Sequence, residues 1–377
     1  MTRTPEISRI WLQFGVHRLG ACLVLLSGFV TAVATDGLGP QARVLAISDP
    51  PPPVLPSDPP LGLVYGLPAD LSSATTVFDT AISPSGPVTL EYLRFDPRGD
   101  AYLTFDAERD EDVAGGLFVI DDLANRDGGS FDAGRDRLIT GAATGLVQPK
   151  SLAVAGRLGF VIVADFGDSS LKVFGARADG DAAPLFITDT LGDTAAGEPR
   201  APWGVAFDGA ADRLFVAATD GTILVFDDYL IDRGRGGPDR FIVPTRDGEK
   251  ASANLHDLIY LDALDMLIVS DVGAATTSDE PGFDADGKLF VMEGVSTADG
   301  NLEAAVQVSG AASSLGNPVG LAYDGANLYV AEKSRDVVLR FDGVLSHSGT
   351  VDLAPSGAVT VLQPESVVLR QGDVAGN

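Results

Sequence analysis

Six residues of different chemistry occupy equivalent positions in a pattern that recurs along the chain. They are Glu91, Lys150, Trp203, His256, Val319 and Glu365. An indole can stack on a sugar or an aromatic ligand, and imidazole or carboxyl groups can transfer protons. We therefore predict a ligand-binding site formed by Glu91, Lys150, Trp203, His256 and Glu365. The same diversity is typical of loop positions that share no role, and we assign no catalytic residue.

Acidic residues end a second recurring segment and form a candidate metal site. The segments end at Asp49, Asp106, Asp165, Asp271 and Glu332. Calcium takes about six to eight oxygen ligands, so these carboxylates and Glu365 would supply a Ca²⁺ site if they converged. The alternative interpretation is structural, because an acid repeated at one position is typical of a turn that accepts backbone N–H groups.

Several other kinds of chemistry are excluded by the residues present. Cys22 is the only cysteine and lies in an N-terminal segment that we expect to be removed, so neither a disulfide nor a cysteine nucleophile is predicted. His256 and His347 are the histidines that follow this segment, too few for a histidine-rich zinc site. Adjacent strand residues point to opposite faces, which argues against a direct pair between His256 and Asp257.

The recurring pattern consists of short strands. Residues 202–208 (PWGVAFD) match residues 318–324 (PVGLAYD) position by position, and looser copies begin at Leu90, Pro149, Leu255 and Pro364. Each complete copy continues through further segments rich in β-branched and aromatic residues, separated by turns. Four strands in a repeat of this length is typical of a propeller blade. The candidate ligand site would start the innermost strands, where loops gather around the channel mouth.

The two ends of the chain complement each other. The last copy has only its first strand, residues 366–369, and segments 43–49, 61–65 and 75–79 resemble the three missing strands. We therefore predict an all-β, six-bladed propeller with four antiparallel strands per blade, closed by a blade that both termini share. The propeller would span residues 43–370, and the Pro-rich stretch 49–60 would be a loop within it. Closure leaves no unpaired sheet edge.

The N-terminus has the features of a secretory signal peptide. Arg3, Arg9 and Arg18 precede an apolar run over 19–30, and small residues end the segment at Ala34. We expect a signal peptide over 1–34, a short segment over 35–42 and a C-terminal tail over 371–377. The protein is then secreted or periplasmic, and lipoprotein anchoring through Cys22 is the alternative. No later apolar stretch is long enough to span a membrane.

The chain is strongly acidic, with 53 Asp and Glu residues against 26 Lys and Arg residues and a formal net charge of −27. This charge argues against nucleic acid and anionic membranes as partners. The acidity would attract cations or basic partners, or would keep an exported protein soluble. We expect a monomer.

The opening P-x-G-[LV]-A-[FY]-D, followed by L-[FY]-V-A and V-x-[VR]-F-D, resembles the NHL-repeat type of β-propeller. Residues 202–208, 318–324, 327–332 and 337–342 carry the resemblance, which covers about residues 43–370. It implies a six-bladed propeller. Propellers of this kind include binding scaffolds, lyases and lactonases, so the resemblance implies no single function.

Two classes of function remain. We favour a non-enzymatic binding or interaction module that uses loops on one face of the ring to bind a protein, glycan or small-molecule ligand. The alternative is a calcium-dependent lactonase or esterase resembling the gluconolactonase and paraoxonase propellers, where calcium polarises a carbonyl. The E-G-P-x-W opening of the gluconolactonase group is absent. An enzyme resembling the streptogramin lyases would need a suitably placed histidine, and His256 is the one available.

Overall fold

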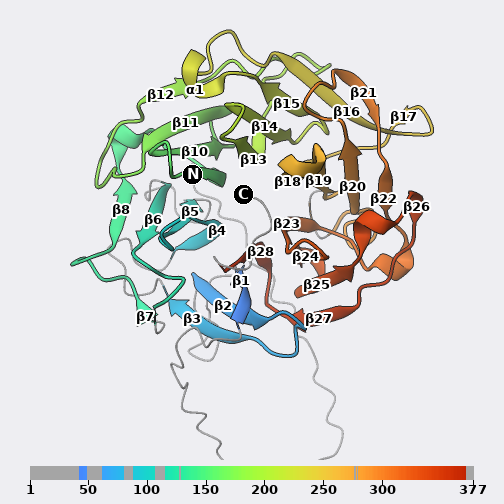
Figure 1. Ribbon diagram of the computed structural model, residues 1–377, viewed down its shortest axis with the longest axis horizontal. Coiled ribbons are helices and arrows are strands. Elements are labelled where there is room, and N and C mark those ends of the chain that lie inside the picture. Colours follow the sequence, from blue (N-terminus) through green and yellow to red (C-terminus); the bar gives the residue numbers. More distant parts are fainter. Residues whose placement is uncertain are drawn as a thin grey trace, which may run out of the picture. The chain divides into compact units, whose positions relative to one another are not determined.

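Six β-sheets are arranged as blades in a ring (Figure 1). The computed structural model describes residues 42–48, 62–79, 88–106, 115–126, 129–275, 277 and 279–370. Its sheets confirm the predicted all-β, six-bladed propeller, with mostly four antiparallel strands per blade. The predicted signal peptide, almost all of the 35–42 segment, the 49–60 loop and the 371–377 tail lie outside the described residues.

Each blade starts with an inner strand at the axis and continues outward. The first blade contains β28 (Pro364–Leu369), β1 (Ala42–Ser48), β2 (Leu63–Pro68) and β3 (Thr75–Asp79). The second contains β4 (Thr89–Phe95), β5 (Ala101–Asp106), β6 (Gly116–Ile120) and β8 (Arg137–Thr140). The third contains β9 (Pro149–Ala155), β10 (Phe160–Asp165), β11 (Ser170–Gly175) and β12 (Phe186–Thr188).

The remaining blades follow the same order. The fourth contains β13 (Pro202–Asp208), β14 (Arg213–Ala218), β15 (Ile223–Phe226) and β16 (Arg240–Arg246). The fifth contains β18 (Leu255–Leu261), β19 (Met266–Asp271), β20 (Lys288–Glu293) and β22 (Val306–Val308). The sixth contains β23 (Pro318–Tyr323), β24 (Asn327–Glu332), β25 (Val337–Asp342) and β27 (Gly357–Thr360).

Short helical turns connect some of these strands. They are η1 (Ala142–Thr144), α1 (Tyr229–Asp232), η2 (Asp262–Leu264), η3 (Ala311–Ser313), η4 (Lys333–Arg335) and η5 (Val344–Ser346). Within the part of the chain that the structure describes, no helix combines the length and apolar character that a membrane span requires.

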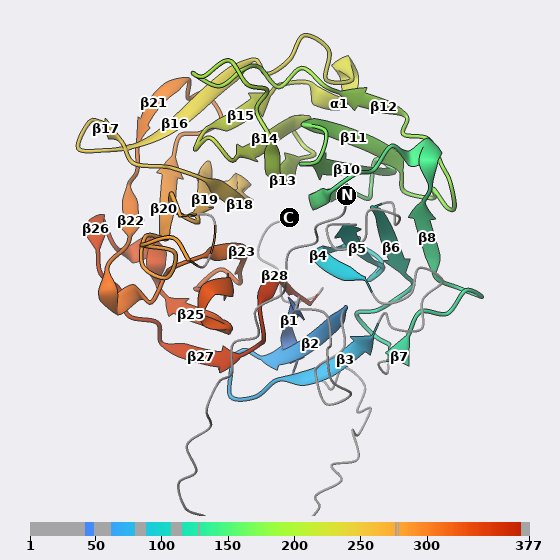
Figure 2. The ribbon, with the colours of Figure 1, turned by 180° about the vertical axis from the view of Figure 1, so that it is seen from behind.

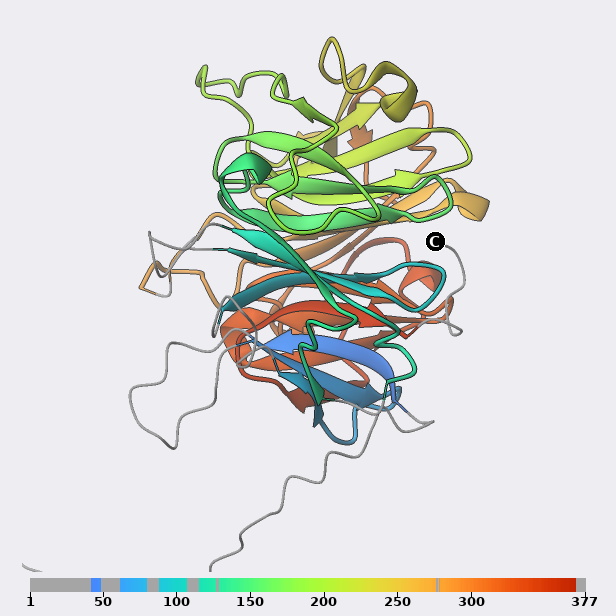
Figure 3. The same ribbon diagram turned by 90° about the vertical axis from the view of Figure 1, so that its left-hand side faces the viewer.

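The inner strands β28, β4, β9, β13, β18 and β23 surround the axis, and each packs against the next (Figures 1 and 2). In the first blade, β28 pairs antiparallel with β1, so this sheet draws strands from both ends of the described chain. The strands run roughly along the ring axis (Figure 3). Each inner strand therefore begins at one mouth of the axis and ends at the other.

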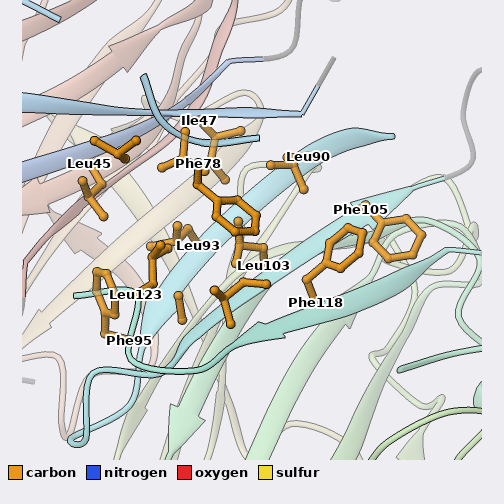
Figure 4. Close-up of a cluster of buried hydrophobic side chains, with 14 of the residues drawn as sticks. Leu45, Ile47, Phe78, Leu90, Leu93, Phe95, Leu103, Phe105, Phe118 and Leu123 are labelled. Atoms are coloured by element: carbon orange, nitrogen blue, oxygen red, sulfur yellow. The ribbon is translucent and has the colours of Figure 1, made fainter. Parts of the chain in front are cut away.

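The hydrophobic core is divided into six clusters, one between each pair of neighbouring blades. In β1, Leu45 and Ile47 face the second blade, whereas Val44 and Ala46 face the sixth. Figure 4 shows the cluster between the first and second blades, where side chains from both sheets meet. A strand that packs on both faces is apolar at successive positions, which explains why these segments do not alternate strictly.

The outer edges of several blades are covered by strands from the following blade. β7 (Gly129–Ser130), β21 (Gly300–Glu303) and β26 (Gly349–Val351) pair in parallel with β3, β16 and β22. β17 (Glu249–Lys250) extends the fourth blade by an antiparallel pair with β16. These short strands were not predicted. They pair backbone groups of outer strands that would otherwise be open to other chains.

Candidate functional site

A β-bulge lies near the start of every inner strand, at the positions singled out in the sequence. In β13, Pro202 pairs with Ala218 and Gly204 pairs with Ala217, which leaves Trp203 as the extra residue. Equivalent register shifts occur at Glu91, Lys150, His256, Val319 and Glu365. A bulge interrupts the alternation of side chains and can aim the extra residue in a new direction.

Lysines and carboxylates form ion pairs where the inner strands begin. Lys150 Nζ lies 3.1 Å from Glu91 Oε1 and 2.5 Å from Asp106 Oδ2. Lys333, from η4, pairs with Glu365. Glu91, Lys150 and Glu365 are all buried. We call this group, with its two aromatic neighbours, the axial cluster: Glu91, Asp106, Lys150, Trp203, His256, Lys333 and Glu365.

The aromatic members of the axial cluster stack on each other. The rings of Trp203 and His256 lie 3.9 Å apart between centroids and 17° from parallel. Lys150 Nζ lies 5.0 Å from the Trp203 ring centroid, and Phe166 meets the indole edge-on. All five predicted ligand-site residues therefore gather in one layer. Val319 packs into the apolar core between the sixth and first blades.

Burial controls the charges of this layer. Burial raises the pKa of Glu91 well above its usual range, although the Lys150 ammonium lowers it, and the Asp106 and Glu365 carboxylates raise it further. Burial lowers the pKa of His256 well below its usual value, and Lys333 and Lys150 add to this effect. The imidazole is therefore neutral at neutral pH. Its Nδ1 atom is buried and has no hydrogen-bond partner among the described residues.

A carboxyl group with a raised pKa near a neutral imidazole is a combination that acid–base catalysts use, and buried structural networks have it as well. Three facts favour the structural role in this layer. Lys150 binds two carboxylates of the layer, Lys333 binds the third, and the indole and imidazole cover each other. The charged and aromatic groups of the layer thus bind one another where the inner strands begin.

A second polar group lies further along the axis. Asp257 is fully buried and accepts hydrogen bonds from the Tyr92 hydroxyl and from the N–H groups of Leu258 and Leu321, at 2.8 and 2.7 Å for the two N–H groups. The Arg94 guanidinium lies 3.6 Å from the same carboxylate. These bonds join the second, fifth and sixth blades. In the described structure no hydrogen bond joins Asp257 to His256, so the two do not form a proton relay.

The acids that end the second strands serve their own blades. Asp165 accepts from the backbone N–H groups of Val147 and Gln148, at 2.9 and 2.8 Å. Asp271 accepts from Ala253 and Asn254 in the equivalent way, and Glu332 from Gly316 and Asn317. Each carboxylate thereby fixes the loop that leads into its inner strand. Asp106 differs, because it binds Lys150 in the axial cluster.

Among the described residues, the candidate metal ligands therefore do not converge on one point, and Asp49 lies outside these residues. Asp106 and Glu365 lie in the axial cluster beside lysines, whereas Asp165, Asp271 and Glu332 are bound by backbone N–H groups of three different blades. The described residues contain no group of three or more His, Cys, Asp or Glu side chains arranged to hold a metal ion.

A cavity of about 730 Å³ lies at the opposite mouth of the axis, where the inner strands end. All six blades line it. Its deepest residues, two or three positions beyond the bulges, are Arg94, Leu152, Val205, Leu258, Leu321 and Val368. Aromatic residues line it closer to the opening, namely Phe95, Phe207, Tyr260 and Tyr323.

The charged lining residues occupy two levels of the cavity. Asp96, Arg157, Asp208 and Asp262 lie at the strand ends and turns around the opening. Asp96 and Asp208 accept hydrogen bonds from backbone N–H groups of those turns, so they cap the turns. Arg94 is the charged residue among the described lining residues of the deepest level. The cavity therefore has an apolar wall, an opening of mixed charge and one cation at its base.

Sequence reasoning missed this cavity because it placed the site where the inner strands begin. The sequence did contain a pattern that marks the cavity end of the inner strands. It is the recurring [FY]-D pair at Phe95-Asp96, Phe207-Asp208 and Tyr323-Asp324. In the sequence these pairs read as part of the fold motif. That interpretation is also valid, because the acid of each pair caps the following turn.

No family model matches the sequence, and no curated protein matches it. Solved structures do match. A chain of a nidogen/laminin complex has a TM-score of 0.56 and 14% identity over 88% of this chain and 99% of that one. A Lactobacillus plantarum protein has a TM-score of 0.52 and 15% identity over 87% and 99%. A "putative 6-phosphogluconolactonase" from Bacteroides fragilis has a TM-score of 0.51 and 13% identity over 88% and 98%.

Identities this low relate folds and carry no activity from one protein to another. The chain shares the β-propeller fold with these proteins. The likeness does not identify the NHL-repeat type in particular, and it does not assign a function.

Proposed function

We propose that this protein is an exported, NHL-like propeller that binds a small organic ligand in the axial cavity and catalyses no reaction. The cavity is the observation that carries the proposal. Its volume of about 730 Å³ falls within the range of about 300–1,000 Å³ that is usual for small-molecule sites. Its lining is more apolar than polar, which is also usual for such sites. The export signal and the NHL-like motif rest on the sequence alone.

The location differs from the one expected from the sequence. The loops around the inner strand starts meet at the axial cluster, whose charged and aromatic groups bind one another. A ligand there would have to displace buried ion pairs, which costs several kcal/mol. At the opposite mouth the space is already formed, so a ligand needs to displace only water.

The calcium-dependent hydrolase is not favoured. That function needs several carboxylates or amides around one ion, and Asp165, Asp271 and Glu332 accept bonds from backbone N–H groups of their own blades instead. The similar fold of the "putative 6-phosphogluconolactonase" does not alter this argument, because propeller scaffolds host unrelated functions.

The test uses the neutral fluorescent probe N-phenyl-1-naphthylamine, whose emission rises in an apolar site. We expect saturable binding to the full-length chain with one site per chain. Ala206→Trp places an indole into the cavity, because Ala206 lines it and is partly exposed. This variant should weaken probe binding at least tenfold. Ala312→Trp is the control, since Ala312 is exposed on η3 and does not line the cavity.

Circular dichroism should show that both variants keep the wild-type fold. Non-saturable binding, or equal loss in the two variants, would mean that the probe does not occupy the cavity. In that case the proposed function is wrong.

A further inference from the structure

We propose that Arg94 binds an acidic group of the cavity's ligand, so that the ligand class is a small apolar molecule with a single carboxylate or sulfonate. The inference rests on the proposed function and adds the chemical class of the ligand. It follows from the position of Arg94, from how its guanidinium is held, and from the charges around it.

Arg94 is placed at the base of the cavity by the register of β4. Its neighbours at the same depth on the other five inner strands are aliphatic: Leu152, Val205, Leu258, Leu321 and Val368. Its side chain is 17% exposed, so it is neither sealed in the core nor free in solvent. An anion that entered the cavity would reach this guanidinium in a largely apolar environment, where a charge-assisted hydrogen bond is strong.

The guanidinium is held in place from below. It lies over the Tyr92 ring at 4.2 Å from the centroid, and its Nη2 donates to the Tyr92 hydroxyl. Nη1 donates to the Leu93 carbonyl at 3.1 Å, and Asp257 lies 3.6 Å away. A guanidinium carries five N–H donors, and these two hydrogen bonds engage two of its nitrogens once each. Donors therefore remain for a ligand, on a group whose orientation is already fixed.

Asp257 forms an ion pair with Arg94 at 3.6 Å, a distance that leaves the guanidinium N–H groups without a hydrogen bond to it. Its carboxylate also accepts from the Tyr92 hydroxyl and from the N–H groups of Leu258 and Leu321. These three hydrogen bonds stabilise the negative charge of Asp257. The distance from Arg94 Nη2 to Asp257 Oδ1 is longer than a hydrogen bond. An incoming carboxylate can thus bind Arg94 without displacing Asp257 from its own partners.

The opening of the cavity limits the ligand to a single anionic group. Asp96, Asp208 and Asp262 lie around it, with Arg157 as the cation at that level. A molecule with several negative charges along its length would meet these carboxylates. A molecule with one acidic end and an apolar body avoids them once its head lies at Arg94, and its body then packs against the aromatic and aliphatic wall.

The experiment compares two dyes that share their ring system. They are 8-anilinonaphthalene-1-sulfonate, which is anionic, and N-phenyl-1-naphthylamine, which is neutral. We expect the wild-type full-length chain to bind the anionic dye at least tenfold more tightly. Arg94→Gln should weaken the anionic dye by about 10- to 100-fold, the usual effect of losing a hydrogen bond to a charged group, and should change the neutral dye less than about threefold.

Arg177→Gln is the matched control, because Arg177 is exposed and does not line the cavity, so the variant removes the same charge away from the ligand. It should change the affinity of either dye less than about threefold. Because Arg94→Gln also takes a cation from buried Asp257, the double variant Arg94→Gln/Asp257→Asn is measured beside it. This variant should show the same selective loss of the anionic dye if the single variant is poorly folded.

The outcomes separate the two claims. If neither dye binds in the cavity, the proposed function fails and this inference fails with it. If both dyes bind and Ala206→Trp blocks them, the cavity binds ligands. If in that case the wild type prefers neither dye, or Arg94→Gln weakens the binding of both equally, the proposed role of Arg94 is wrong.

Discussion

Replacing Lys150 by Met should destabilise the protein strongly, and more so as the pH rises. The variant removes an ammonium that lies 3.1 Å from Glu91 Oε1 and 2.5 Å from Asp106 Oδ2, two carboxylates that are almost fully buried. Removing one partner of a buried pair typically costs about 3–5 kcal/mol, because the remaining charge stays desolvated. We therefore expect Lys150→Met to lower the free energy of unfolding by about that amount near neutral pH.

The sign of the pH dependence follows from Glu91. Burial already raises its pKa in the folded wild type, and Lys150 opposes that rise, so the variant should raise the pKa further. A carboxyl whose folded pKa exceeds its unfolded pKa binds its proton more tightly in the folded state. Its contribution to stability is present below the unfolded pKa and is lost as the pH rises through the folded pKa, by up to about 1.4 kcal/mol per pH unit.

Urea unfolding followed by tryptophan fluorescence between about pH 5 and pH 8 measures both effects. Lys150→Met should lose part of its deficit at the acid end, and Glu91→Gln in the same chain should recover part of it near neutral pH. Lys250→Met is the control, because Lys250 is exposed and donates to the Asp220 carbonyl at the surface. A deficit below about 1 kcal/mol, or one that grows as the pH falls, would refute a structural role for the ion pairs of the axial cluster.

Two further predictions concern the second-strand acids. Asp271→Ala removes the acceptor of three backbone N–H groups, at Ala253, Asn254 and Gly273. It should lower the free energy of unfolding in urea by about 2–4 kcal/mol. The control Asp193→Ala, at an exposed position, should lower it by less than about 0.5 kcal/mol. Calcium should raise the melting temperature of the full-length chain no more than magnesium at matched ionic strength, because these acids do not converge; a saturable rise specific to calcium would restore the hydrolase alternative.

The repeated elements of the fold were predictable because they repeat a physical requirement. Residues 202–208 and 318–324 share a glycine, and the structure explains it. A Cβ atom at Gly204 would lie 2.3 Å from the His256 carbonyl oxygen, and one at Gly320 would lie 2.8 Å from the Ser366 Cα atom. Neighbouring inner strands come this close at both positions, so the same residue type recurs. The shared acid recurs because each copy caps the same turn.

Features without a repeated sequence signal were harder to predict. The outer strands β7, β21 and β26 are two to four residues long and arise from loops that differ between blades. The role of Asp257 depends on partners in two other blades, at positions far apart in the chain. The sequence predicted which residues start the inner strands, but period-two reasoning could not predict the bulges that redirect them. NHL-type membership and export remain predictions from the sequence.

The two mouths of the axis differ because the same six strands carry side chains of different sizes at their two ends. Where the strands begin, the positions at the bulges are mostly long or aromatic side chains, and these fill the axis. Where they end, several small residues line the space: Ala153, Ala155, Gly156, Ala206, Gly209, Ala210 and Ala322. Small side chains that line a space give up contacts that larger ones would make. Ala153, Ala206 and Ala322 recur at one position of the repeat, so the fold itself requires a small residue there, and the space that they leave is the one that the proposed ligand would occupy.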